Sequence, residues 1–302
     1  MNDTYKKQVA LLLKILPEVA VEKKFALHGG TAINLFEFEM PRLSVDIDLT
    51  FTIIGEREKD IQKIRLLLEK LKERIEKRIP SITFPDPIVA LENLKINCVT
   101  KDATVKIEVN QINRGLMSPS RVMTLCKKAQ EEFDSFCEIS VVSSEQLWGG
   151  KLIAALDRQH PRDLFDINNM LSTIGFTEDI KKGFIFFLLC SKRPIHEVLD
   201  PQFTNQEDVF GSQFDGMTDE TFTNDKYEGV KDQLIETIHK SLNKEDKDFL
   251  LAFAKGDPNW DGVDYSLYLA VRWKLLNIDK LKKANPEKFH EQITLLEQVL
   301  AQ

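Results

Sequence analysis

The stretch FALHGGTAINLFEFEMPRLSVDIDLTF, residues 25–51, constrains the fold of this chain more than any other segment. It places two adjacent glycines, Gly29 and Gly30, before a short apolar helix. It then places Asp46 and Asp48 inside a segment that otherwise has the character of a buried strand. Carboxylates in such a strand are costly unless something pairs with them, and two on one side of a strand also repel each other. The pattern therefore predicts a cation beside the strand.

Composition excludes several classes of protein. The 302 residues are 42% hydrophobic and 29% charged, which is ordinary for one large or two medium globular domains. No run approaches the roughly 18 apolar residues of a membrane span, so we expect a cytoplasmic protein. The four cysteines lie far apart without a CxxC pair, which indicates reduced core residues and no zinc site. A net charge of -7 argues against a surface that binds nucleic acid everywhere, although a local basic groove would not alter that sum.

Hydrophobic periodicity predicts an α+β fold. The first half mixes strands and helices, whereas the second half is almost entirely helical. We therefore expect a core with a mixed sheet flanked by helices over residues 1–170, and a helical C-terminal domain over residues 171–302. About five helices are expected after residue 175. Residues 201–225 are polar and lack either hydrophobic period, which predicts a long loop or lid.

Individual elements follow from the same patterns. Residues 56–78 carry one apolar helical face, and residues 103–110 alternate so that Lys106 and Glu108 share the polar side of a strand. Pro161 suits a first helical position. The other expected elements are strands at 25–30, 45–51 and 94–99, and helices at 31–39 and from Ser143 or Ser144 onward.

The glycines and the aspartates together indicate nucleotide chemistry. Because side chains alternate along a strand, Asp46 and Asp48 project to one face and can hold a divalent cation between them. A strand that runs through Gly29, Gly30 and Thr31 into a helix offers backbone N–H groups and a hydroxyl to a phosphate. Phosphate and Mg²⁺ beside paired carboxylates are typical of phosphoryl-group transfer. Each part alone also fits a simple turn followed by an exposed edge strand.

The order of motifs resembles a known family. GGTAINL, PRLSVDIDL, KIEVN, LWGGKLIAALDR and RDLFDI resemble the AbiEii/AbiGii-type abortive-infection toxins of the nucleotidyltransferase superfamily related to DNA polymerase beta. GDPNW and VRWKLLNIDKL are similar to that family's C-terminal region, so the resemblance covers residues from about 25 to 300. It implies a Mg²⁺-dependent toxin of a toxin-antitoxin system that transfers a nucleotide from an NTP to RNA, with tRNA as the expected acceptor, and releases pyrophosphate. It also implies a repressor-type antitoxin that need not touch the toxin.

The resemblance assigns roles in the N-terminal half. Gly29, Gly30 and Thr31 correspond to the triphosphate turn, where the family often has Gly-Ser. Ser44 and Arg42 would support the following strand, and Arg42 could also neutralise phosphate charge. The Mg²⁺ ligands are Asp46 and Asp48, with Glu108 as a candidate third carboxylate that completes the metal site or takes the attacking proton. The alternative for Glu108 is a surface ion pair with Lys106.

Four further residues come from the LWGGKLIAALDR and RDLFDI motifs. The resemblance makes Lys151 an active-site residue, which we expect on the β- or γ-phosphate, and Arg158 lies seven residues later on the same helix face. The alternative for Arg158 is a salt bridge to Asp163 or Asp166. These two aspartates are expected to orient Lys151 or Arg158 instead of touching metal.

Two other functions remain open at this point. The same core could transfer a nucleotide to a small-molecule or protein hydroxyl, and a narrow acidic pocket would favour that reading over RNA. The chain could also be a catalytically silent module that binds nucleotide. The retained Asp46, Asp48, Glu108 and Lys151 weigh against the silent module, because nothing but function requires repelling carboxylates to stay together.

Overall fold

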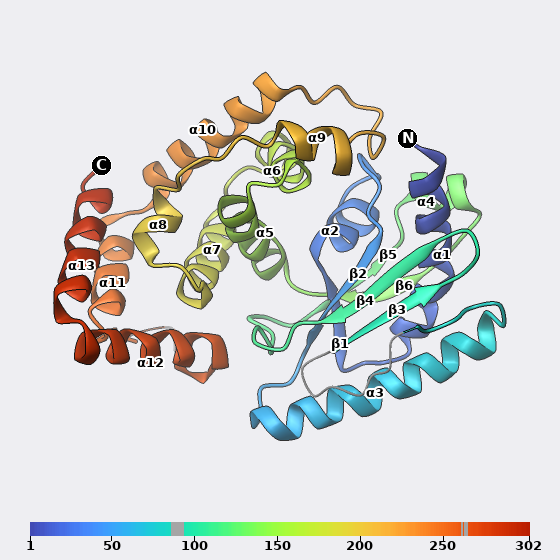
Figure 1. Cartoon of the computed structure of the whole chain (residues 1–302), viewed down its shortest axis with the longest axis horizontal. Coiled ribbons are helices and arrows are strands. Elements are labelled where there is room, and N and C mark those ends of the chain that lie inside the picture. Colours follow the sequence, from blue (N-terminus) through green and yellow to red (C-terminus); the bar gives the residue numbers. More distant parts are fainter. Residues whose placement is uncertain (86–93, 261, 263–264) are drawn as a thin grey trace. The chain divides into compact units, whose positions relative to one another are not determined.

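The computed structural model describes residues 1–85, 94–260, 262 and 265–302. The chain divides into two compact units. The first contains Met1–Ser143 and Ser212–Thr221, and the second contains Ser144–Gly211 and Phe222–Gln302. Figure 1 follows the chain from blue at the N-terminus to red at the C-terminus.

The first unit is built on a mixed sheet of six strands within the described residues, in the order β3-β4-β2-β1-β6-β5. Strand β1 runs antiparallel to β2 and parallel to β6, whereas β2 runs parallel to β4. The two edge strands, β3 and β5, are each antiparallel to their neighbour. The expected α+β class is confirmed. The strands are β1 (Phe25–His28), β2 (Asp46–Phe51), β3 (Lys95–Val99), β4 (Thr104–Val109), β5 (Arg121–Thr124) and β6 (Glu138–Val141).

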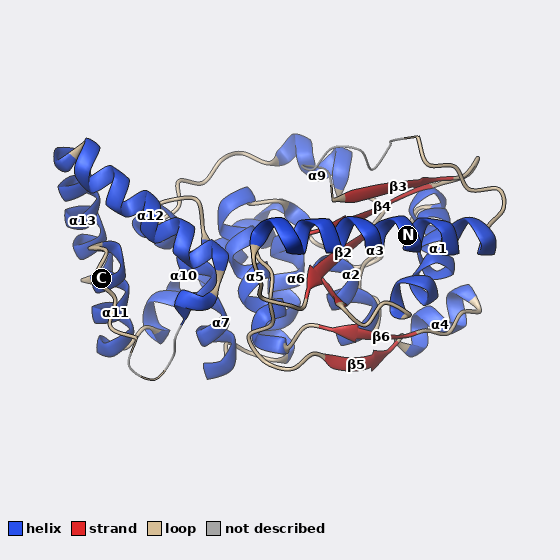
Figure 2. Cartoon of the chain, turned by 90° about the horizontal axis from the view of Figure 1, so that it is seen from below, coloured by secondary structure: helices blue, strands red, loops and turns tan. Residues whose placement is uncertain are grey.

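Helices cover the apolar face of this sheet. In β4, alternate residues Val105, Ile107 and Val109 are buried while the residues between them are not, so the strand has one apolar face. Helix α1 (Asp3–Ala20) contacts β4 and β6, and α3 (Arg57–Arg78) contacts α1 and β3. Figure 2 shows both helices (blue) beside the strands (red). The expected helix at residues 56–78 is confirmed, and its apolar stripe is buried. The polar face of β2 and β4 is therefore the one that can carry chemistry.

A short helix connects β1 to β2 and brings the glycines into position. It begins as α2 (Gly29–Ala32) and continues as a wider π-turn, η1 (Ile33–Glu37), as expected from the apolar run after the glycines. Two elements complete the first unit. Helix α4 (Lys127–Phe133) lies between β5 and β6, and the segment Ser212–Thr221 comes from much later in the chain.

The second unit is helical in the described residues. Its tightest packing joins α5 to α7, where a Cβ added to Gly183 would lie 1.9 Å from the carbonyl oxygen of Glu145. A Cβ on Gly149 would lie 2.3 Å from the carbonyl carbon of Gly183, so neither position tolerates a side chain. The helices are α5 (Ser144–Arg158), α6 (Pro161–Thr173), α7 (Glu178–Cys190), α8 (Ile195–Leu199), α9 (Glu207–Gln213, which ends in the first unit), α10 (Asn224–Ser241), α11 (Lys244–Ala254), η2 (Tyr265–Leu267), α12 (Leu269–Ala284) and α13 (Pro286–Leu300).

Some expectations need correction. The described residues after Gly175 contain seven α-helices, more than the five expected, because short helices such as α8 and α9 carry too little periodicity to be recognised. The segment 201–225 is not wholly a loop, since α9 lies inside it. The first compact unit ends its main segment at Ser143, earlier than residue 170, because α5 packs mainly on α7. A functional boundary at residue 170 stays a prediction. Among the described residues, no helix is long and apolar enough to cross a membrane.

Candidate active site

The Gly29 turn holds a carboxylate of β2 at close range. Strand β1 ends at His28, and Gly29 then adopts a φ of +73°, a left-handed conformation that favours glycine. A Cβ at Gly29 would lie 2.6 Å from Oδ2 of Asp48. The glycine is therefore required twice, once for its backbone angle and once for the space that the Asp48 carboxylate occupies.

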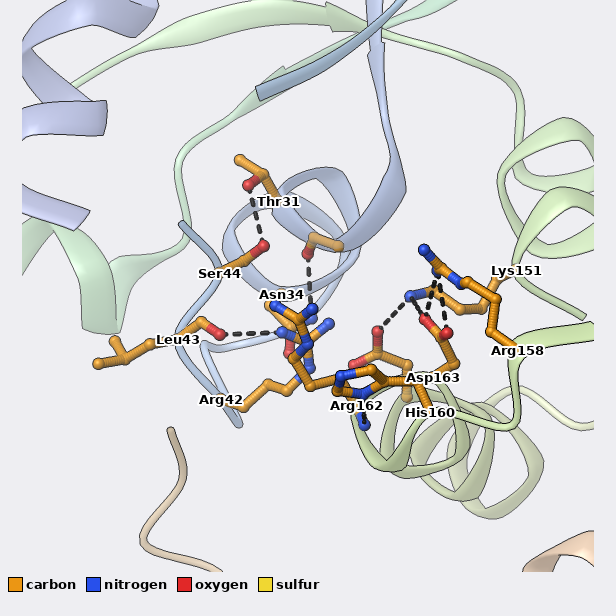
Figure 3. A network of polar contacts seen from close by, with 12 residues as sticks. Thr31, Asn34, Arg42, Leu43, Ser44, Lys151, Arg158, His160, Arg162 and Asp163 are labelled. Carbon is orange, nitrogen blue, oxygen red and sulfur yellow. Dashed lines mark hydrogen bonds and ion pairs between the residues drawn. The ribbon is translucent and has the colours of Figure 1, made fainter. Parts of the chain in front are cut away.

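The second glycine has a similar close approach on its other side. A Cβ at Gly30 would lie 2.9 Å from both Nη2 of Arg42 and Oγ of Ser44. Arg42 is 3% exposed, and its Nη1 donates a hydrogen bond of 2.9 Å to the carbonyl of Leu43 (Figure 3). The turn thus lies between a carboxylate and a guanidinium, which is a polarised environment suited to a charged ligand.

Thr31 fastens the turn to β2. Its hydroxyl donates to the backbone carbonyl of Asp46 and lies 3.0 Å from Oγ of Ser44. The residue is only 1% exposed. The expected hydroxyl contact with phosphate is not available in this conformation, because the hydroxyl already serves the internal bond. Asn34 adds a second brace, since its Nδ2 donates a 3.0 Å hydrogen bond to the carbonyl of Gly30 (Figure 3).

The three predicted carboxylates lie on two neighbouring strands, β2 and β4. Asp48 is in register with His28 of β1 and with Glu108 of β4, and Asp46 is in register with Lys106. Residues in register on neighbouring strands share a face, so both aspartates lie on the polar side with Glu108 and Lys106. Both aspartates are half-buried, whereas the Glu108 side chain is 49% exposed. The register brings the three predicted carboxylates to one patch of the sheet.

Glu108 pairs with Lys106, which is the alternative that the sequence left open. Nζ of Lys106 lies 2.8 Å from Oε2 of Glu108. Burial opposes the charge of Lys106, but the hydrogen bond to Glu108 and the negative charges of Asp46, Glu108 and Asp48 raise its pKa overall. In the part of the chain that the structure describes, no group of three His, Cys, Asp or Glu residues is close enough to hold a metal. Two carboxylates remain, and Mg²⁺ commonly uses one or two of these together with substrate phosphates. The donor set fits a Mg²⁺ ion that arrives with a nucleotide.

The second unit contains its own buried charge cluster. Nζ of Lys151, on α5, lies 3.0 Å from Oδ1 of Asp163 and 2.7 Å from Oδ2 of Asp166, both on α6 (Figure 3). Lys151 is 7% exposed. The guanidinium of Arg158, largely exposed, lies 2.9 Å from Oδ2 of Asp163. Burial would raise the pKa of Asp163, but the charges of Lys151 and Arg158 hold it below its ordinary value.

This cluster has the arrangement that was expected of the two aspartates. They bind the cations and hold the Lys151 ammonium in one orientation, while Arg158 forms the salt bridge given as its alternative role. An ammonium has three donors, and Asp163 and Asp166 use two of them, which leaves one for a ligand. Lys151 and Asp48 belong to different compact units, so their joint action on one nucleotide stays a prediction.

Sequence reasoning missed two contributors to the turn. Asn34 lies four residues after Gly30 on the same short helix, so helical spacing could have indicated it. Thr218, which forms an isolated antiparallel bridge with Arg42, could not have been found, because the two lie 176 positions apart and no local pattern joins them.

Comparison with known proteins shows the family and the fold of the chain. Residues 10–267 match the family described as "Nucleotidyl transferase AbiEii toxin, Type IV TA system". Among solved structures, the chain is similar to MenT4, a nucleotidyltransferase toxin from Mycobacterium tuberculosis H37Rv, with a TM-score of 0.62 and 13% identity. The alignment covers 92% of this chain and 95% of that one, and at this identity it shows a shared fold. No curated protein matches the sequence.

Proposed function

The chain belongs to the AbiEii family of nucleotidyltransferase toxins of type IV toxin-antitoxin systems, and from this we propose that it transfers a nucleotide from an NTP to RNA. The proposed acceptor is tRNA, the reaction depends on Mg²⁺, and pyrophosphate is released. The proposed setting is the cytoplasm, where NTPs and RNA are both present. A separately encoded antitoxin of repressor type is the proposed partner.

The observation that carries the proposal is the contact between the glycine turn and β2. The backbone of Gly29 and the carboxylate of Asp48 are so close that no side chain fits at position 29. Asp46 points to the same face, and the guanidinium of Arg42 reaches Gly30 from the other side. The start of a helix, the guanidinium of an arginine and two carboxylates, all within residues 29–48, are the parts that a nucleoside triphosphate with Mg²⁺ requires.

In the proposed reaction, an acceptor hydroxyl attacks the α-phosphorus of the NTP. A bond forms between the acceptor oxygen and the α-phosphorus, and the bond to the bridging oxygen breaks, so that pyrophosphate leaves with the electron pair. Mg²⁺, held by Asp46 and Asp48, would neutralise charge on the phosphate oxygens. Arg42 would balance the charge of the leaving phosphates.

Glu108 and Lys151 have proposed roles that their contacts support. Glu108 is exposed and forms an ion pair with Lys106, so a small change of rotamer frees it to accept the proton of the attacking hydroxyl. The Lys151 ammonium forms ion pairs with Asp163 and Asp166, and we assign its remaining donor to the β- or γ-phosphate. Arg158 is proposed to assist through Asp163.

Label transfer tests the proposal. The purified protein with Mg²⁺ would be given each NTP labelled at the α-phosphorus, with total tRNA, total RNA without tRNA, or no RNA. Label in tRNA from one preferred NTP, lost in Asp46→Asn and Asp48→Asn, is the expected result. Asp102→Asn, an exposed aspartate in the β3–β4 hairpin, is the matched control and should keep full activity. Label in protein or in small molecules alone would refute the RNA acceptor, and tight NTP binding without any transfer would indicate a silent module.

A further inference from the structure

A ten-residue segment from the C-terminal half of the sequence belongs to the first unit. Residues Ser212–Thr221, here called the strap, run from the last residues of α9 toward α10, but they pack with the sheet unit. Two of its side chains are buried, with Phe214 at 4% exposure and Met217 at 2%. The backbone N–H of Asn2 also donates a 2.7 Å hydrogen bond to the carbonyl of Gly216.

The strap is bonded to the segment that leads into β2. The N–H of Leu43 donates a 2.7 Å hydrogen bond to the carbonyl of Met217, and Oγ1 of Thr218 donates one of 2.7 Å to the carbonyl of Pro41. Thr218 also forms an isolated antiparallel bridge with Arg42. The backbone groups of Pro41 and Leu43 therefore obtain from the strap hydrogen bonds that a neighbouring strand would otherwise supply.

The bonded segment is the one that supplies side chains to the second glycine. Arg42 and Ser44 are the groups that a Cβ on Gly30 would meet at 2.9 Å. Neither residue belongs to a helix or a regular strand, so local secondary structure does not fix their positions. An arginine has many rotamers, and its guanidinium stays at one place only when its backbone is held.

We propose that the strap, through Met217 and Thr218, positions Arg42 and Ser44 at the Gly30 turn and so sets the affinity for the triphosphate of the nucleotide. Thr218 is a positioning residue that acts through Arg42. The proposal rests on the proposed nucleotidyl transfer for its kinetic consequence, whereas its structural part is independent of activity.

Thr218→Val tests the proposal, because valine keeps the shape and removes the hydroxyl bond to Pro41. Thr221→Val is the control, since Thr221 lies in the same strap and is exposed. Hydrogen exchange of a peptide that contains Leu43 should become faster in Thr218→Val and stay unchanged in Thr221→Val. KM for the preferred NTP should rise about three- to tenfold in Thr218→Val, with kcat changed less than twofold.

A double-mutant cycle with Arg42→Lys separates positioning from general stability. If Thr218 acts through the guanidinium, Thr218→Val should raise KM less than twofold when Arg42 is already lysine. An equal fold-change in both backgrounds, or unchanged exchange at Leu43, would overturn the proposal. If the wild-type chain transfers no nucleotide to any acceptor, the proposed function fails. The positioning role of the strap is then tested by hydrogen exchange at Leu43 and by equilibrium binding of Mg²⁺–ATP to the same variants. The fold-changes expected in Kd are those given above for KM.

Discussion

Replacing Gly29 by alanine tests whether the position of the Asp48 carboxylate matters for metal-dependent transfer. The new Cβ would lie 2.6 Å from Oδ2 of Asp48, and real Cβ contacts are essentially never shorter than 3.0 Å. The carboxylate or the turn must therefore move by about 0.4 Å. Metal sites tolerate only about 0.2 Å in ligand distance, and a 1 Å misplacement of a reacting group can cost about 100-fold in rate. We expect Gly29→Ala to lower transfer at least tenfold and to raise the Mg²⁺ concentration for half-maximal activity.

The same substitution also strains the backbone, so a control is needed. At a φ of +73°, alanine costs about 1–2 kcal/mol. Gly175 has a φ of +76° with nothing within 4 Å of its Cβ position, so Gly175→Ala carries the same strain far from the carboxylates in sequence. Both variants should melt earlier, by about 2–4 °C for each kcal/mol. Only Gly29→Ala should lose activity.

The assay is label transfer over a Mg²⁺ titration, with thermal unfolding of each variant without Mg²⁺. If Gly29→Ala kept the wild-type rate and the wild-type Mg²⁺ dependence, the Asp48 carboxylate could not be a ligand whose place depends on this turn. If Gly175→Ala lost activity as strongly as Gly29→Ala, general loss of stability would explain both effects and the argument from the close contact would fail.

Three further predictions test other parts of the structure. Lys106→Met removes the ion-pair partner of Glu108 and one positive charge near the proposed metal site, so the Mg²⁺ concentration for half-maximal activity should fall about twofold or more. An unchanged Mg²⁺ titration would place Glu108 outside the metal site. Lys151→Met leaves two buried aspartates without its charge and should cost about 3–5 kcal/mol in urea unfolding at neutral pH. Because the pKa of Asp163 is lowered in the folded state, its charge stabilises the wild type above the ordinary pKa of 3.8, and this stabilisation is lost as the pH falls through the folded-state pKa. The difference in unfolding free energy between the wild type and Lys151→Met should therefore shrink in acid. A difference that stays constant with pH would contradict the argument. Gly183→Ala should lower the free energy of unfolding by about 3 kcal/mol, because the new Cβ overpacks α5 and α7. Its control, Gly229→Ala, has open space at its Cβ and should stabilise α10 by about 1 kcal/mol. Equal melting temperatures of the two variants would refute the packing argument.

The sequence predicts the sheet core well because its signals are local. Alternation in residues 103–110 fixes which side chains share a face, and the glycine pair before an apolar run fixes where β1 turns into a helix. The apolar stripe of α3 is equally explicit over 22 residues. Each of these features depends on neighbours within a few positions, which a single sequence displays.

Long-range contacts could not be predicted in the same way. The bond from Leu43 to Met217 joins residues whose local sequences contain no sign of each other. Strand register is equally hard to predict, because the pairing of Asp48 with Glu108 depends on the arrangement of the whole sheet and not on the sequence of either strand. Whether Glu108 forms an ion pair or binds metal depends on the rotamer of Lys106, and the sequence alone does not determine a rotamer.

The most direct measurement of the central claim compares two labels of one nucleotide. The protein, Mg²⁺ and tRNA would be incubated with the preferred NTP labelled either at the α- or at the γ-phosphorus, beside Asp48→Asn. Nucleotidyl transfer predicts that the α-label moves to tRNA, that the γ-label appears in pyrophosphate, and that neither occurs in the variant. Transfer of the γ-label to the acceptor would mean that the chain is a kinase. Release of the γ-label as free phosphate without modified RNA would make it a nucleotide hydrolase, and either result would contradict the proposed chemistry.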